Sequence, residues 1–160
     1  MATRIDLIFQ SLVDVDVLFD ETGDSTYEVV PSYNIDMLPE TIIEDDTPCR
    51  LLLALGTRAE ARSIVPVTLN GSVASIGWRI TDLFLLKPAG ATQGLSAEVP
   101  TLLRYVKANF DALQGVGFKL ARVSTIENVT YEMDVFEYPR GSRKYFFGVE
   151  VTIFVKETAQ

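Results

Sequence analysis

The fold is decided by residues 64–86, which read IVPVTLNGSVASIGWRITDLFLL. The dipeptide Asn70-Gly71 is the pair that most favours a tight turn between two antiparallel strands. We therefore predict a β-hairpin in which Ile64–Leu69 pairs with Ser72–Leu86. The second strand is long enough to form the centre of a sheet, and the other elements are placed around it.

Hydrophobic side chains fall on both faces of this second strand. One parity holds Trp78, Ile80, Asp82, Phe84 and Leu86, and the other holds Arg79, Thr81, Leu83 and Leu85. A strand with one wet face alternates strictly between apolar and polar residues. We therefore expect burial to change along the strand, and we expect Asp82 to be a partly buried, hydrogen-bonded structural carboxylate rather than a catalytic acid.

The N-terminal part predicts a helix and two strands. Ile5, Ile8, Phe9 and Leu12 recur with helical spacing. Alternating valines then predict a strand over Val13–Phe19, with acids on its wet face. Cys49–Leu55 is a continuous apolar run, which is typical of a buried strand, and we interpret Gly56–Ser63 as a basic loop.

The C-terminal half predicts a longer helix followed by two strands. Ser96 is the expected helix cap, with Pro100 in the first turn. The expected buried stripe of this helix is Val99, Leu102, Leu103, Val106, Phe110 and Leu113. Phe118–Phe136, broken near Glu127-Asn128, and Tyr145–Lys156 then predict an antiparallel pair.

These elements predict one α+β domain over residues 1–160. Its sheet is mainly antiparallel and is flanked by the N-terminal helix and the longer central helix. Residues 20–48 are rich in Asp, Glu, Ser, Thr and Pro, and loops of this length are unusual in compact domains unless they are functional or disordered. We interpret them as an extended acidic loop or arm, mobile or ordered by a partner, with a short hairpin as the alternative.

Charge divides the chain into two parts. The net charge is −8, but residues 1–48 carry twelve acidic side chains and a single basic one, Arg4, whereas residues 49–160 carry thirteen basic and ten acidic side chains. The overall negative charge argues against general nucleic-acid binding through phosphate contacts. No apolar run reaches the roughly 20 residues of a membrane-spanning helix, and the N-terminus is unlike a secretory signal. We therefore expect no membrane partner.

The absence of histidine removes most enzymatic interpretations. Without His the chain has neither the commonest general base nor the commonest metal ligand, and it cannot build a Ser-His-Asp or Cys-His centre. Cys49 follows a proline at the start of an apolar strand, where a thiol acts as a small hydrophobic group. The glycines near residue 90 lack the lysine of a phosphate-binding loop. We therefore predict no catalytic residue, no cofactor and no metal.

Two charged clusters remain as candidate binding features. Glu44-Asp45-Asp46 is the densest acidic cluster, which we interpret as a solvated turn, with weak divalent-ion binding as the alternative. Arg140, Arg143 and Lys144 lie between two tyrosines in the last predicted turn. This basic turn is interpreted either as a site for phosphate or for an acidic protein surface, or as a solvated turn.

Several segments together resemble a known family of structural proteins. They are Trp78–Leu85, Leu102–Phe110, Phe136–Pro139 and Tyr145–Ile153. In their layout, a helix, strands, a helix crossing the sheet and a final antiparallel pair, the chain resembles the tail terminator, or tail completion, proteins of tailed bacteriophages. The acidic segment 20–48 departs from a minimal member of that family.

The resemblance implies a structural role in the virion. Such a protein is synthesised in the host cytoplasm and forms a ring, usually of six copies, at the neck or tail end of the virion. The ring caps the tail tube and meets the head-side connector, with DNA only passing through its lumen. The alternatives are a head-tail joining or other neck adaptor protein, and a non-viral scaffold or adaptor domain. An enzyme is the least favoured reading.

A ring needs two different complementary surfaces on each subunit. We hypothesise that the acidic segment meets a basic surface of the neighbouring copy. The acidic residues of this interface are Asp20, Glu21, Asp24, Glu44, Asp45 and Asp46, and the basic ones are Arg58, Arg62, Arg140, Arg143 and Lys144.

Overall fold

A computed structural model describes residues 4–53, 67–70, 73–90, 94–116 and 124–159 of the chain. Its helices are α1 (Arg4–Val13) and α2 (Val99–Val116), with short 3-10 turns η1 (Glu44–Asp46) and η2 (Leu95–Ala97). Its strands are β1 (Leu18–Phe19), β2 (Glu28–Val29), β3 (Ser32–Tyr33), β4 (Cys49–Leu53), β5 (Val67–Asn70), β6 (Val73–Pro88), β7 (Ser124–Glu137) and β8 (Tyr145–Ala159). The α+β class is as predicted.

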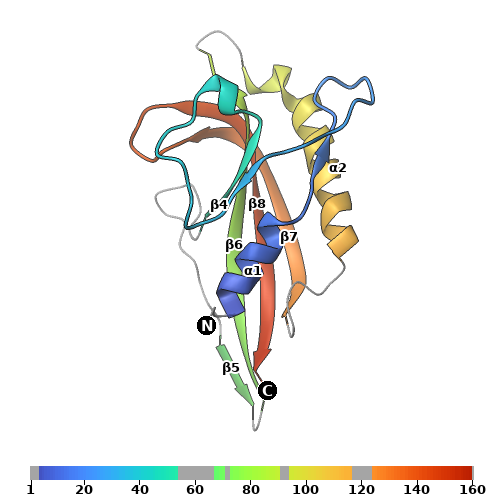
Figure 1. Ribbon diagram of the computed structural model, residues 1–160, viewed down its shortest axis with the longest axis vertical. Helices are drawn as coiled ribbons and strands as arrows, with labels where there is room; N and C mark the ends of the chain where they lie inside the picture. The colour runs from blue at the N-terminus through green and yellow to red at the C-terminus, as the bar shows by residue number, and fades with distance from the viewer. Residues whose placement is uncertain (1–3, 54–66, 71–72, 91–93, 117–123, 160) are drawn as a thin grey trace.

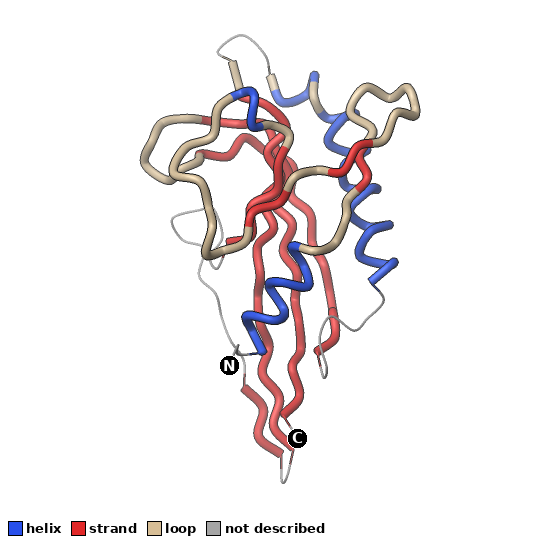
Figure 2. Tube along the Cα trace, in the orientation of Figure 1, coloured by secondary structure: helices blue, strands red, loops and turns tan. Residues whose placement is uncertain are grey.

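One sheet organises the molecule (Figure 1). Its strand order is β3-β4-β6-β8-β7, and β5 pairs with the far end of β6. Every pairing in it is antiparallel except the short one between β3 and β4. The predicted hairpin around Asn70 is confirmed, since Val67–Asn70 pairs with the start of β6. Beyond the helices, β5, β6 and β8 continue as a narrow ribbon that ends near the C-terminus (Figures 1 and 2).

The two helices lie against the same face of the sheet. Ile8 and Leu12 of α1, and Leu102 and Tyr105 of α2, share one core cluster with Phe84 of β6. A second cluster on the opposite face holds Leu83 and Leu85 of β6 with Ile42 from the acidic segment. Both faces of β6 are therefore buried from residue 80 to residue 86 and less so before it, which confirms the predicted change in burial.

The helix α2 follows the predicted buried stripe only in part, since Leu102 and Leu113 are buried and Val106 packs against the main core cluster. Its fully buried positions are Leu102, Tyr105 and Asn109, whereas Leu103 and Phe110 are about half exposed. Leu103 follows Leu102 by one position, about 100° further around the helix, so the two cannot face the sheet together. The predicted cap was also wrong, because Ser96 lies within η2 and α2 begins at Val99.

For Val13–Phe19 the predicted alternation of buried side chains is confirmed, but the predicted strand is wrong over most of its length. The side chains of Val15, Val17 and Phe19 are buried, as their alternation predicted. However, α1 continues to Val13, and only Leu18–Phe19 pairs as a strand, with Glu28–Val29. One further hydrogen bond continues this pairing, since the Val17 carbonyl accepts from the amide of Val30 at 3.0 Å.

Residues 20–48 fold onto the domain instead of extending from it. The β1–β2 hairpin closes their first part, which agrees with the hairpin alternative. Val30 is buried in the first core cluster and Ile42 in the second, so two anchors fix the segment to opposite faces of the sheet. The prediction of an arm is corrected, because burying these two apolar side chains offsets the cost of ordering the loop.

The C-terminal pair follows the prediction closely. β7 pairs with β8 along its whole length, and its register shifts between Ile126 and Asn128, at the predicted break. Such a shift leaves one residue, Glu127, unpaired as a β-bulge. β8 runs to Ala159, three residues past the predicted end at Lys156. The predicted residues 118–123 of the first strand lie outside the described part of the chain.

Candidate assembly interface

An acidic groove opens between the β1–β2 hairpin and η1. It has a volume of about 400 Å³. Its acidic residues are Glu21, Asp24, Glu28, Asp45 and Asp46. Its apolar lining is Phe19, Val29, Val30, Pro31 and Pro48. Acids separated by more than twenty positions in the sequence thus meet at one surface, which we call the acidic groove.

Hydrogen bonds hold the hairpin wall of this groove. The carboxylate of Asp20 accepts from the amides of Gly23 at 2.9 Å and Ser25 at 3.0 Å, and that of Asp24 accepts from the Thr26 amide at 3.0 Å. Hydrogen bonds to the side chains of Thr22 and Thr26 lower the pKa of Asp24 below its ordinary value. These bonds favour the ionised form of Asp24.

The other wall is the turn that contains the Glu44-Asp45-Asp46 cluster. The carboxylate of Asp46 accepts from the amide of Ile43 at 2.9 Å. Among the described residues there is no group of three or more side chains placed to hold a metal ion. The structure therefore places Glu21, Asp24, Asp45 and Asp46 in the groove, whereas Asp20 and Glu44 lie beside it and do not line it.

Arg104 of α2 holds the β1–β2 hairpin through its backbone carbonyls. Its guanidinium donates from Nε to the carbonyl of Asp20 at 3.1 Å and from Nη2 to the carbonyl of Glu21 at 2.8 Å. The sequence did not reveal this role, because an arginine on a helix is ordinarily a solvated charge. Glu28 was missed as well, although it belongs to the same acidic stretch.

The basic turn joins β7 to β8. Arg140, Arg143 and Lys144 are exposed there. Glu137 organises the turn, since its carboxylate accepts from the amides of Gly141 at 2.8 Å and Arg143 at 3.1 Å. The ammonium group of Lys144 donates to the hydroxyl of Thr41 at 2.9 Å. No ion pair joins Arg140, Arg143 or Lys144 to another described residue, although the charge of Arg140 helps to lower the pKa of Glu137.

The acidic hairpin and the basic turn lie on opposite sides of the same end of the molecule (Figure 1). The loop between β1 and β2 projects beside α2, and the loop between β7 and β8 projects on the other side of the sheet. Within the described part of the chain no ion pair joins the two surfaces. Arg58 and Arg62, the other predicted basic residues, lie outside the described residues.

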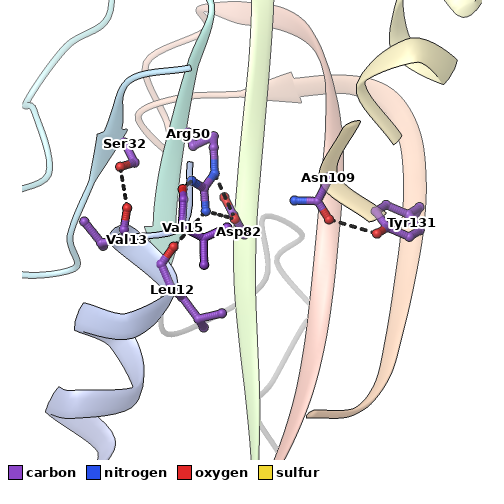
Figure 3. Close-up of polar contacts among 8 residues, drawn as sticks. All are labelled: Leu12, Val13, Val15, Ser32, Arg50, Asp82, Asn109 and Tyr131. Carbon is purple, nitrogen blue, oxygen red and sulfur yellow. Dashed lines mark hydrogen bonds and ion pairs between the residues drawn. The ribbon is translucent and has the colours of Figure 1, made fainter. Parts of the chain in front are cut away.

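A buried ion pair lies away from both surfaces (Figure 3). The Nη2 atom of Arg50 on β4 is 2.7 Å from Oδ2 of Asp82 on β6, and both side chains are almost fully buried. Arg50 also donates to the carbonyls of Leu12 at 3.0 Å and Val15 at 2.8 Å, at the end of α1. Burial opposes the charge of Arg50, but the carboxylate of Asp82 raises its pKa overall. Asp82 is thus the hydrogen-bonded structural carboxylate that the sequence predicted.

The single cysteine has no reactive character. Cys49 is fully buried in the second core cluster. Burial, together with the charge of Asp46, raises the pKa of its thiol to about 12. Because the thiolate is the reactive form, Cys49 is a small hydrophobic group at neutral pH, as predicted.

The chain matches no known protein family model, and no curated protein matches it. Within the described ranges, no helix has both the length and the apolar character required to cross a lipid bilayer. The functional interpretation therefore depends on the chemistry and placement of the two charged surfaces.

Proposed function

We propose that the chain is a structural subunit in the neck of a tailed bacteriophage, of the tail terminator type. It is proposed to assemble into a ring, which we expect to contain six copies. The observation that supports this most is the placement of the β1–β2 hairpin, which forms one wall of the acidic groove, and the basic turn on opposite sides of one end of the subunit. Two unlike surfaces on one subunit give a head-to-tail contact, and such contacts form a ring when the rotation from one subunit to the next closes on itself.

Apolar groups beside each charged surface add to the proposed contact. Leu18 and Val29 are paired across the β1–β2 hairpin and are both about half exposed. Tyr145 is also about half exposed, directly after the basic turn. Stable interfaces combine an apolar centre with a charged rim, and tyrosine and arginine are enriched in them. Each side of the proposed contact therefore has both components.

The ring is proposed to contact the tail tube on one side and the head-side connector on the other. A neck adaptor, or a non-viral scaffold protein, would use the same surfaces for a different partner. The two readings differ in what the pure chain does alone. A terminator ring appears by negative-stain microscopy as closed rings, whereas an adaptor stays monomeric until its partner is added.

Charge reversal tests the pairing of the two surfaces. Arg140→Glu with Arg143→Glu places two negative charges against the neighbour's acidic groove, so we expect the mass measured by light scattering to fall toward that of a monomer. The effect grows weaker as salt rises, because exposed charges are screened. The matched control is Lys107→Glu, which reverses an exposed charge on α2 that is paired with Asp111.

A charge swap makes the test specific. Glu21→Lys with Asp45→Lys reverses two groove residues whose carboxylates make no hydrogen bond seen among the described residues. Alone, this variant is expected to lose assembly, and mixed with the Arg140→Glu, Arg143→Glu variant it is expected to regain it. Assembly that is unchanged in each of the two charge-reversal variants measured alone would reject the contact between groove and turn.

A further inference from the structure

A chain of polar side chains crosses the main core cluster, beneath α2. It begins at the buried pair of Arg50 and Asp82 and ends at Tyr131 on β7, whose hydroxyl donates to Oδ1 of Asn109 at 2.8 Å. Asn109 lies on the core face of α2 and is fully buried, although its side chain is polar. A buried amide in such a place is costly unless its hydrogen bonds are made.

Three polar atoms in this chain make no well-aligned hydrogen bond with the described residues, and for one of them, the hydroxyl of Tyr105, the side chain of Asn109 is near enough to act to lower its pKa. They are Oδ1 of Asp82, the hydroxyl of Tyr105 and Nδ2 of Asn109. All three residues are completely buried. The set contains an acceptor, a donor and a group that can do either, which is the complement that a single water molecule satisfies.

The backbone places the residues that carry these atoms close together. Asp82 and Tyr131 both pair with Val151, so they lie in the same row of the sheet, two strands or roughly 10 Å apart. Tyr105 and Asn109 are four residues apart on α2 and so lie on one face above that row. The ring of Tyr105 stacks on Phe84 at 3.6 Å between centroids, two positions along β6 from Asp82.

The side chains also point inward between these elements. In Figure 3 the amide nitrogen of Asn109 points away from Tyr131 and toward the strand that carries Asp82. The charge of Asp82 acts, after burial, to raise the pKa of both Tyr105 and Tyr131. Both tyrosine hydroxyls therefore lie within electrostatic reach of the carboxylate and remain protonated at neutral pH.

We propose that one water molecule binds inside the core, donating to Oδ1 of Asp82, accepting from Nδ2 of Asn109 and bonding the hydroxyl of Tyr105. Buried waters typically make about three such bonds. The bound water completes a hydrogen-bonded path from the end of α1, through Arg50 and Asp82, to α2 and β7. It lies below the helix turn that carries Arg104, which holds the acidic hairpin.

A crystal structure that resolves ordered solvent, together with water magnetic relaxation dispersion, tests this site. The expected result is one long-lived water with these three partners. Asn109→Leu with Tyr131→Phe removes the amide without leaving the tyrosine hydroxyl unpaired, so the number of long-lived waters falls by one. Tyr131→Phe alone is the control, because it keeps Nδ2 of Asn109 and with it the water.

A second variant covers the case in which the double variant does not fold. Tyr105→Phe keeps the ring stacked on Phe84 and removes only the hydroxyl, so the water keeps two of its three partners and exchanges faster. A direct hydrogen bond between the Asn109 amide and the Asp82 carboxylate, with no density between them, would overturn the proposal. So would an unchanged water count or exchange rate in both the double variant and Tyr105→Phe.

Discussion

The buried pair and the exposed charged surfaces use the same residue types in opposite ways. Arg50 makes its hydrogen bonds within the chain, to Asp82 and to two carbonyls at the end of α1. Arg140 and Arg143 sit on an exposed turn whose backbone, not their side chains, is held by Glu137. A charge that is fully bonded inside the chain fixes the fold, whereas one left at the surface is available to a partner.

The difference has an energetic basis. Exposed ion pairs contribute about 0 to 1 kcal/mol, because water solvates the separated charges almost as well. Buried charges are not solvated when they are separated, so removing one partner leaves the other uncompensated. Substitutions at the buried pair should therefore change stability, and substitutions at the two surfaces should change assembly while the subunit stays folded.

The largest expected effect is at the buried pair. Asp82→Asn leaves the guanidinium of Arg50 buried without its counter-charge, and we expect the free energy of unfolding to fall by about 3 to 5 kcal/mol. Urea denaturation measures this loss. The matched control is Asp111→Asn, which breaks the exposed pair with Lys107 on α2 and should cost about 0.3 to 0.5 kcal/mol. Equal losses in the two variants would contradict the distinction between the two kinds of charge.

Two glycines provide a second comparison of the same regions. A Cβ at Gly148 on β8 would lie 2.1 Å from the carbonyl oxygen of Phe84 in the neighbouring strand. Because that oxygen belongs to the paired backbone, Gly148→Ala must displace β6 from β8, and we expect it to lower the free energy of unfolding by about 3 kcal/mol.

Gly141 lies in the basic turn and meets nothing within 4 Å, but its φ is +82°. The left-handed conformation costs a residue with a Cβ about 1 to 2 kcal/mol, so Gly141→Ala should be the milder change in urea denaturation. The opposite order of the two variants would show that the turn, and not the strand pair, is the more constrained region.

The sequence predicted those features that depend on short-range pattern. The Asn70-Gly71 hairpin, the helical spacing of α1 and the break near Glu127-Asn128 follow from residues within a few positions of one another. The folded state of residues 20–48 did not follow, because it depends on Val30 and Ile42 packing against strands far along the chain. Loop composition alone does not distinguish an anchored loop from a free one.

The candidate interface was predictable in composition but not in shape. Glu21 and Asp45 were expected to act together because both are acidic, yet their meeting in one groove depends on how the hairpin and η1 are folded. The sequence did not reveal the two arginines that hold the elements around the site. Arg104 holds the hairpin through backbone carbonyls, and Arg50 fixes the end of α1 in the same way, so neither contact leaves a pattern in side-chain spacing.

The smallest expected effect is at Glu137, next to the exposed basic turn. Glu137 is an acid of the basic turn that is used within the chain, and hydrogen bonds from the amide of Gly141, then of Arg143, lower its pKa below the ordinary value of 4.5. A carboxylate whose pKa is lower in the folded chain stabilises the fold above its ordinary pKa, and this contribution is lost as the pH falls through the lowered value.

The amide resonances of Gly141 and Arg143 should therefore titrate together by NMR, with a midpoint below 4.5. In Glu137→Gln this titration should disappear, because the amide side chain keeps its shape but has no proton to gain. A midpoint at or above the ordinary value would mean that Glu137 is solvated like its neighbours. Other contacts would then fix the conformation of the turn. Burial alone would then decide which charged side chains stabilise the fold and which are available to a partner.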